Sequence, residues 1–240
     1  MIEKTKTTKF FREEFLDSEI EEMIKAGVQF GRLTSHLHPK MKEYVLGMRG
    51  RIHIIDLRET KKKLKEALEF IKQLVSEGKT ILFVGTKIPA KEIVKEIAKE
   101  CEFPYVVERW IGGLFTNFEN ILKRIERLKE LEEKEKKGEF DKYTKKERAL
   151  FEKEIERLKE KFGGLKKLEK LPDAVFIVDP TKERFCVKEA KKKGIKIIAI
   201  LDTNSDPTQI DFPIPANDTS LSSLKYILNK VKEVILEEKK

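Results

Sequence analysis

Cysteine, histidine and tryptophan are scarce in this chain of 240 residues, which contains two, three and one of them. Cys101 and Cys186 stand far apart in helix-like patterns, which argues against a disulfide framework and a Cys-x-x-Cys zinc motif, and indicates buried free thiols. No run of 18 apolar residues occurs, and the first residues lack the apolar stretch of a secretion signal. We therefore expect a cytoplasmic protein with no membrane partner.

Charged residues, by contrast, are abundant. Lysine and arginine number 52 against 43 aspartates and glutamates, so the formal net charge at pH 7 is +9. A basic balance favours a nucleic acid or an acidic membrane as partner, although solubility alone can also produce it. The excess is local, because residues 40–65 contain nine basic and three acidic residues. Within this stretch, Lys61-Lys62-Lys63 is either a solvated helix face or part of a nucleic-acid surface.

Apolar runs alternate with helical patterns over most of the chain. Strands are predicted at residues 51–57, 80–85, 104–107, 174–179 and 195–202, a short extended piece at 212–215, and helices at 60–77, 89–101, 181–193 and 219–238. Strands that alternate with helices of this length predict parallel βαβ units, and therefore a doubly wound α/β fold with a mostly parallel sheet. A further helix is predicted to begin with a capping box of Ser18 and Glu21 and to end at Gly27.

Residues 119–165 interrupt this alternation. Apolar residues recur there at the spacing of a helix seam in two stretches: Ile121, Ile125 and Leu128, and then Phe151, Ile155, Leu158 and Phe162. Most other positions are charged, which predicts an antiparallel coiled-coil hairpin that protrudes from the rest. We therefore predict an α/β domain formed by residues 1–118 and 166–240, with the coiled-coil hairpin of residues 119–165 inserted in it.

The most informative segment is residues 109–118, Arg-Trp-Ile-Gly-Gly-Leu-Phe-Thr-Asn-Phe. Gly112 and Gly113 permit close approach of another surface, and Thr116 and Asn117 are good caps for the helix that follows. A helix start offers free backbone N–H groups to an anion. Together with Arg109 and Trp110, these features favour binding to a polyanion backbone; the alternative is a tight turn packed under a core tryptophan.

Three predicted strands end in aspartate, which permits an enzyme interpretation. Asp56, Asp179 and Asp202 could hold Mg²⁺ at the carboxyl ends of parallel strands, as in a phosphosugar or nucleotide enzyme. The segment Gly85-Thr86-Lys87 could cradle a phosphate, but it lacks the P-loop frame. The aspartates fit helix caps and turns equally well, Asp179 as a cap before a proline. No convincing nucleophile and base are found, so no catalytic residue is assigned.

Two other hypotheses carry different expectations. His36 and His38 are a possible metal pair, but their spacing and the lack of a nearby cysteine argue against a zinc site. We expect neither a metal nor a cofactor. An adaptor that binds through the coiled-coil hairpin, with no affinity for RNA, is the remaining alternative to an RNA-binding protein and an enzyme.

With these pieces in order, the chain resembles the bacterial-type second protein family of the small ribosomal subunit. The matching segments run from about residue 16 to 235: residues 26–31, 39–41, 51–57, 83–87, 109–118, 171–176, 202–207 and 214–218. The Trp-Ile-Gly-Gly and Asp-Thr-Asn motifs, in that order, are highly specific. The chain departs from the family at Gln29 and Arg32, where histidine is usual, and at Leu37-His38, where Trp-Asn is usual.

The resemblance implies a flavodoxin-like domain with an inserted hairpin and no catalysis. It implies binding to small-subunit ribosomal RNA near the junction of head and body, with neighbouring small-subunit proteins, including the large multi-OB first protein, as further partners. The residues expected to contact the RNA are Arg32, Lys40, Lys42, Arg49, Arg51, Lys87, Arg109, Trp110, Gly112, Gly113, Thr116 and Asn117. Such contacts would recognise the shape and backbone of the RNA more than its sequence.

Overall fold

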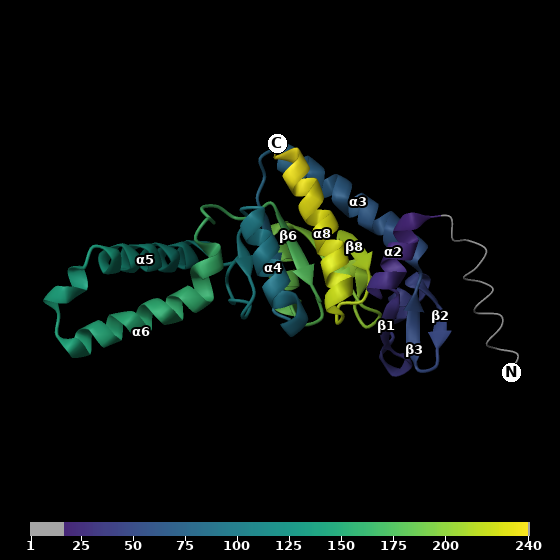
Figure 1. Ribbon diagram of the computed structural model, residues 1–240, viewed down its shortest axis with the longest axis horizontal. Helices are drawn as coiled ribbons and strands as arrows, with labels where there is room; N and C mark the ends of the chain where they lie inside the picture. Colours follow the sequence, from purple (N-terminus) through teal and green to yellow (C-terminus); the bar gives the residue numbers. More distant parts are fainter. Residues whose placement is uncertain (1–16, 240) are drawn as a thin grey trace, which may run out of the picture.

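The computed structural model describes residues 17–239, and a five-stranded parallel sheet forms its centre (Figure 1). The strands are β4 (Ile81–Val84), β5 (Tyr105–Val106), β6 (Ala174–Val178), β7 (Lys196–Leu201) and β8 (Phe212–Pro215). They lie in the order β5-β4-β6-β7-β8, and all neighbouring pairs are parallel. The predicted doubly wound α/β fold is confirmed, while residues 1–16 of the predicted domain lie outside the described part.

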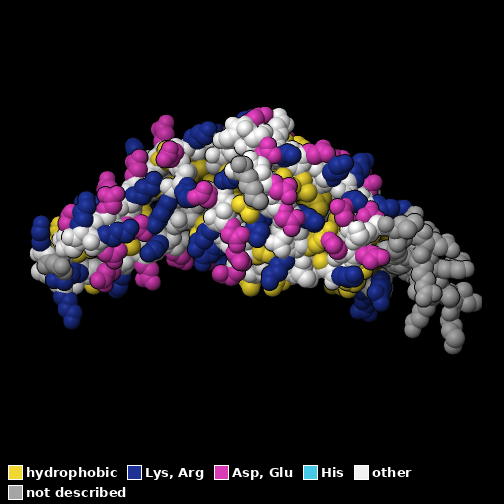
Figure 2. Space-filling view, turned by 45° about the horizontal axis from the view of Figure 1, so that its top comes forward, with side chains coloured by type: hydrophobic (Ala, Val, Ile, Leu, Met, Phe, Trp, Pro, Cys, Tyr) yellow, Lys and Arg dark blue, Asp and Glu magenta, His cyan; other side chains and the backbone are white. Residues whose placement is uncertain are grey.

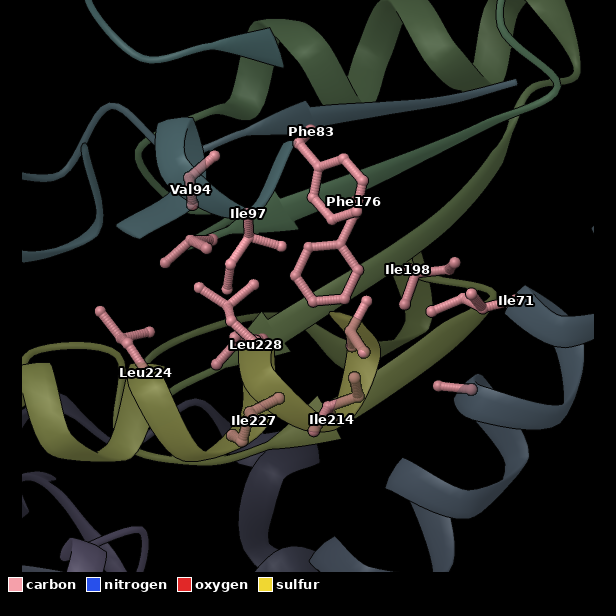
Figure 3. Packing of buried hydrophobic residues seen from close by; sticks show 14 of the residues in the cluster. Ile71, Phe83, Val94, Ile97, Phe176, Ile198, Ile214, Leu224, Ile227 and Leu228 are labelled. Atoms are coloured by element: carbon pink, nitrogen blue, oxygen red, sulfur yellow. The ribbon is translucent and has the colours of Figure 1, made fainter. Parts of the chain in front are cut away.

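Helices cover both faces of this sheet. Successive residues of a strand point to opposite faces, so each central strand presents apolar side chains on both. One face is covered by α3 (Leu57–Ser76), α4 (Ile88–Glu100) and α8 (Leu221–Glu238), and the other by α7 (Arg184–Lys193). Phe83, Phe176 and Ile198 face the group of three helices, whereas the residue before each of them faces α7 (Figure 3). The apolar runs of the central strands are therefore buried on both sides, as the sequence predicts.

A second, antiparallel sheet corrects one part of the sequence prediction. Its strands are β1 (Phe30–Leu33), β2 (Val45–Arg49) and β3 (Ile52–Ile55), in the order β1-β3-β2. The strand expected at 51–57 does form, but it pairs with its neighbours in sequence and not with the parallel sheet. Gly50, at φ +63°, makes the tight turn between β2 and β3 possible. The strand β1 is mostly half-buried and β2 is largely exposed, so neither contains the buried apolar run that would predict it.

Three helix starts also differ from the prediction. Helix α3 begins at Leu57, three residues earlier than expected, because Asp56 caps it. Helix α2 (Ser18–Ala26) ends at Gly27 as expected, but its N-cap is Asp17, whose Oδ1 accepts from Glu19 N at 3.2 Å, and not Ser18. Helix α7 begins at Arg184, three residues later than predicted, because Asp179 adopts a left-handed φ of +62° and a turn follows it. Asp179 is therefore not a helix cap. A left-handed φ is unusual for a residue other than glycine, and residues with such backbone conformations cluster at functional sites.

The interruption in the sequence forms two long helices, α5 (Phe118–Lys136) and α6 (Lys145–Phe162), which run beside each other and project from the body (Figure 1). The predicted seam residues Ile121, Ile125, Leu128, Ile155, Leu158 and Phe162 are buried. Phe151 is half-buried and stacks on Phe140, with ring centroids 4.9 Å apart. A true coiled-coil geometry for this helical hairpin stays a prediction.

Short 3₁₀ helices complete the fold. They are η1 (Thr34–His36), η2 (Pro39–Tyr44), η3 (Glu139–Lys142), η4 (Gly163–Leu165) and η5 (Pro207–Gln209). The helix η4 carries the chain from the hairpin back toward the sheet, where a Cβ on Gly164 would lie 2.2 Å from the Tyr105 carbonyl oxygen. The root of the hairpin is therefore packed directly against the edge strand β5.

Phe176 is expected to be a major contributor to stability, because its ring is fully buried and lies 5.5 Å from that of Phe83. Phe176→Ala should lower the free energy of unfolding by about 3–5 kcal/mol, measured by urea denaturation. The matched control is Phe185→Ala, at a side chain that is 56% exposed, which should change stability by no more than about 0.5 kcal/mol. Equal losses in the two variants would contradict the assignment of the core.

Candidate nucleic-acid interface

The parallel sheet reverses its strand order at β4, because β5 lies on one side of that strand and β6 on the other. Doubly wound folds bind ligands beyond the carboxyl ends of the strands at such a point. Here Lys87 follows β4 and Asp179 follows β6, and Lys87 Nζ lies 3.0 Å from Asp179 Oδ2. The place where such a fold takes a ligand is filled by an internal ion pair.

This ion pair belongs to a buried network of five side chains. Lys87 Nζ also lies 2.6 Å from Asp218 Oδ1, and Arg32 Nη2 lies 3.0 Å from the same oxygen. Arg32 Nε is 2.9 Å from Asp202 Oδ2, and all three carboxylates are at most 9% exposed. Since Arg32 comes from β1, the network ties the antiparallel sheet to the parallel one. Removing one partner from a buried pair costs about 3–5 kcal/mol.

The network contains two cations and three carboxylates, which affects their protonation. Burial, assisted by the charges of Asp179 and Asp202, raises the pKa of Asp218 to about 7. Burial also opposes ionisation of Asp179, but Lys87 and the Lys182 amide outweigh it and lower the pKa of that carboxyl. Asp218 therefore takes up a proton more readily than an ordinary aspartate, and its Oδ2 is buried without a hydrogen-bond partner in the described part of the chain.

These contacts bear on the enzyme interpretation. Asp179 and Asp202 do lie in one network, but Asp56 follows β3 of the other sheet and caps α3, accepting from Arg58 N at 2.9 Å. Of the proposed phosphate cradle, Thr86 Oγ1 donates to Glu183 and Lys87 is ion-paired. Within residues 17–239, no group of three His, Cys, Asp or Glu side chains is placed to hold a metal ion. The structure thus gives each of these residues an internal role.

The segment 109–118 is held by one carboxylate. Glu189 of α7 accepts hydrogen bonds at its Oε1 from Trp110 Nε1 at 3.2 Å and from Gly113 N at 2.8 Å. Its Oε2 accepts from Phe115 N at 3.0 Å and from Thr116 N and Oγ1 at 3.2 and 3.3 Å. Gly113 lies at φ +88°, a conformation that turns its amide toward the carboxylate and favours glycine. Although burial opposes ionisation, these bonds lower the pKa of Glu189.

This clasp, defined as Glu189 with its five donors, corrects part of the sequence analysis. The amides of Gly113 and Thr116 were expected to be free for an RNA phosphate, but a carboxylate of the protein itself occupies them. The ring of Trp110 is 9% exposed and packs edge-on against Phe115, with centroids 5.0 Å apart. The backbone of this segment does bind an anion, but that anion is the internal Glu189 carboxylate. Contact of the segment with RNA stays a prediction. Asn117 is the N-cap of α5 by position, without a side-chain cap bond.

The remaining predicted cations lie on the surface. Lys42, Arg49, Arg51 and Arg109 are exposed and make no ion pair with any described residue. Lys40 is also exposed, and its Nζ donates to Thr208 Oγ1 at 3.0 Å. Arg49 and Arg51 flank the turn between β2 and β3, whereas Arg109 follows β5, on the side of the body from which the hairpin projects (Figure 1). The exposed cations therefore lie on two sides of the α/β body.

Arg32 and Lys87, by contrast, are 32% and 15% exposed and serve as counter-ions of the network. Arg32 stands where the resemblance implies a histidine. Its guanidinium reaches two carboxylates at once, through Nε to Asp202 and Nη2 to Asp218, and it stays charged at every pH of interest. A role for Arg32 or Lys87 in RNA binding stays a prediction, and it would have to compete with these ion pairs.

Two side chains that organise the region were missed from the sequence. Asp218 follows β8, and Glu189 sits in α7 three residues after buried Cys186 and one before buried Ala190. That spacing places the Glu189 carboxylate on the inward face of the helix, which is the signal that could have found it. A charged residue at an apolar-face position needs a partner, and the Gly-Gly segment is that partner.

Ion pairs therefore fill the crevice at the carboxyl ends of the parallel strands, while other cations are exposed on the surface. Exposed cations of this kind are typical of proteins that bind a polyanion such as a nucleic acid. In the described part of the chain, no helix is both long and apolar enough to cross a membrane.

Comparison with known proteins identifies the family. The family model described as "Ribosomal protein S2" matches residues 23–238. The chain is 49% identical over 220 residues to "Small ribosomal subunit protein uS2" of Dictyoglomus thermophilum, covering 92% of this chain and 89% of the relative. Proteins of the same name from Dictyoglomus turgidum and Dehalococcoides mccartyi are 49% and 44% identical over 218 residues, 91% of this chain and 89% of each relative. The chain belongs to the ribosomal protein S2 family.

Glu189→Gln is expected to loosen the clasp, because the amide replaces one acceptor oxygen with a donor that faces N–H groups. Buried donors left without a partner should cost about 1–3 kcal/mol of stability. Since Trp110 is the single tryptophan, its fluorescence reports the loop directly and should shift to the red. The control Glu96→Gln, at an exposed site on α4, should change neither the stability nor the Trp110 emission maximum. An unshifted emission maximum in Glu189→Gln would contradict the clasp.

The raised pKa of Asp218 predicts that the free energy of unfolding depends on pH. Its pKa of about 7 in the folded chain lies above its ordinary value of 3.8, so its contribution to stability is complete below pH 3.8 and is lost as the pH rises through 7. Relative to Asp218→Asn, the wild type should lose about 1 kcal/mol per pH unit at the steepest part of this window. Urea denaturation of both proteins at pH 5, 6, 7 and 8 measures this; parallel curves would refute the assignment.

Proposed function

We propose that this protein is a structural constituent of the small ribosomal subunit that binds ribosomal RNA through its exposed cations and has no catalytic role. The observation that carries the proposal is the contrast between two groups of predicted cations. Arg32 and Lys87 neutralise buried carboxylates, whereas Lys42, Arg49, Arg51 and Arg109 are exposed without a described ion-pair partner. Unpaired surface arginines and lysines are the groups that position a protein on a phosphate backbone.

The distribution of these cations supports binding to folded RNA. They extend from the β2–β3 turn on one side of the α/β body to the loop after β5, at the root of the hairpin, as the element positions in Figure 1 indicate. On the face shown in Figure 2, basic and acidic side chains are interspersed and do not form one continuous basic patch. Separated contacts of this kind fit several RNA helices at once, and recognition then depends on the shape of the RNA.

Partners and organisation belong to the same proposal. Neighbouring small-subunit proteins, including the multi-OB first protein, are the expected protein partners, and the cytoplasm is the expected location. The division into an α/β domain of residues 1–118 and 166–240 and a hairpin of residues 119–165 is likewise proposed. It is supported by the projection of α5 and α6 from the body (Figure 1).

Sedimentation of a native lysate in a sucrose gradient tests the assignment as a whole. The protein should co-migrate with small ribosomal subunits and should be released by a high-salt wash, because screening weakens phosphate contacts. Migration at the top of the gradient at every salt concentration would overturn the proposal.

Arg109 gives a test at the level of one residue. Arg109→Ala should weaken binding to purified small-subunit RNA and reduce the slope of log K against log salt by about one unit, since one phosphate contact is lost. Lys99→Ala removes the same charge from an exposed position on α4, which covers the other face of the sheet, and should leave the slope unchanged. An unchanged slope for Arg109→Ala, with native folding, would remove Arg109 from the interface.

A further inference from the structure

A cleft with a volume of about 610 Å³ lies between the loop at Ile111 and Gly112 and the root of the hairpin. Both helices of the hairpin line it, α5 near its start and α6 near its end. Its volume is within the range of small-molecule and cofactor sites, about 300–1,000 Å³. The proposed function does not use this cleft, apart from the contacts expected of Gly112 and Asn117 in its wall.

The rim of the cleft is positively charged. Five cations line it, and no acidic residue is among its lining residues: the cations are Lys123, Arg124, Arg127, Arg157 and Lys161. Arg127 is ion-paired, with its Nε 3.5 Å from Glu154 Oε1 and its Nη1 3.7 Å from Glu130 Oε2. The other four form no ion pair within residues 17–239.

The like charges around the cleft lower the stability of the isolated protein. Arg124 and Arg127 are three residues apart on α5, and Arg157 and Lys161 are four apart on α6, so each pair lies on one helix face. Like charges at such spacing destabilise a helix. Bringing both rows to one cleft adds repulsion between the helices, which a bound polyanion would relieve.

The floor of the cleft has a different chemistry from its rim. It is formed by apolar side chains, namely Ile111, Ile121, Leu158 and Phe162. Gly112 forms part of the wall, and a Cβ added there would meet no atom within 4 Å. Asn117 and Asn120 provide amide groups at the edge and bond to each other, Asn120 Nδ2 donating to Asn117 Oδ1 at 2.7 Å. An apolar floor, amides at the edge and a cationic rim match a ligand that is flat and apolar at one end and anionic at the other.

We propose that this cleft holds one unpaired nucleotide of ribosomal RNA, with its base on the apolar floor and the flanking phosphates on the arginine rim. Proteins recognise RNA chiefly at unstacked nucleotides, whose faces pack on side chains and whose edges bond to amides. Guanidinium groups bind phosphate oxygens through two parallel hydrogen bonds. An acidic peptide would satisfy the rim but would leave the floor uncovered. The inference rests on the proposed function and assigns it a specific pocket.

The first test compares two triple variants of the full chain with equal charge loss. Arg124→Gln/Arg157→Gln/Lys161→Gln removes three cations from the rim, whereas Lys134→Gln/Lys136→Gln/Lys153→Gln removes three exposed cations farther along the same helices. Affinity for purified small-subunit RNA is measured by filter binding at several salt concentrations. The rim variant should bind about 10–100-fold more weakly, with a salt slope reduced by about 2, and the control should stay within about twofold of wild type.

The possible outcomes separate the two proposals. Equal losses in both triple variants, or none in the rim variant, would overturn the cleft while leaving RNA binding intact. Wild-type protein that binds small-subunit RNA no better than transfer RNA would overturn the proposed function itself. A rim variant that binds RNA normally but fails to enter subunits would show that the cleft takes a protein, which also refutes the inference.

The second test locates the RNA. Gly112→Cys places a thiol in open space at the wall, and iron-EDTA attached to it cleaves RNA nearby by hydroxyl radicals. Cys101 and Cys186 should not react, because both are buried and burial raises the pKa of each thiol, that of Cys101 to about 11. Cleavage should centre on an unpaired nucleotide that wild-type protein protects from chemical modification. Cleavage confined to paired helices, or none, would overturn the inference, and Lys134→Cys serves as the tether control.

Discussion

The buried ion-pair network at the carboxyl ends of the parallel strands is the constraint on which the rest of the molecule depends. It joins residues that follow β4, β6, β7 and β8, and it reaches Arg32 in the antiparallel sheet. Because its three carboxylates are buried, each needs a cation, and Arg32 ties the two sheets together. The same network occupies the crevice that doubly wound enzymes leave for a ligand. That crevice is therefore filled by the protein's own side chains.

A second internal anion acts in a similar way on the loop between β5 and the hairpin. Glu189 gathers five donors from residues 110–116 and so fixes the path of the chain into α5. That path sets one wall of the cationic cleft, since Ile111 and Gly112 belong to the same loop. The Glu189 carboxylate therefore positions one wall of the cleft whose rim is basic. The clasp and the cleft are two sides of one loop, the first facing α7 and the second facing the hairpin.

The sequence predicts the parallel sheet, its covering helices and the helical hairpin because these elements rest on local signals: apolar runs, helical spacing and glycine ends. It misplaces the strand at 51–57, since the pairing partner of a strand depends on contacts that apolar patterning does not encode. It predicts that residues 109–118 face a polyanion, but it does not show that the Glu189 carboxylate occupies the Gly113 and Thr116 amides. Nor does it show that Arg32 and Lys87 pair with buried carboxylates, because the sequence does not tell an exposed cation from a buried counter-ion.

The attachment of the hairpin to an edge strand has a mechanical consequence. Helix α5 has 19 residues and so reaches about 28 Å from its start. Both helices leave from the root, where η4 contacts β5 and the loop held by Glu189 leads into α5. A force on the far end of this arm would therefore reach the parallel sheet through its edge strand and that loop.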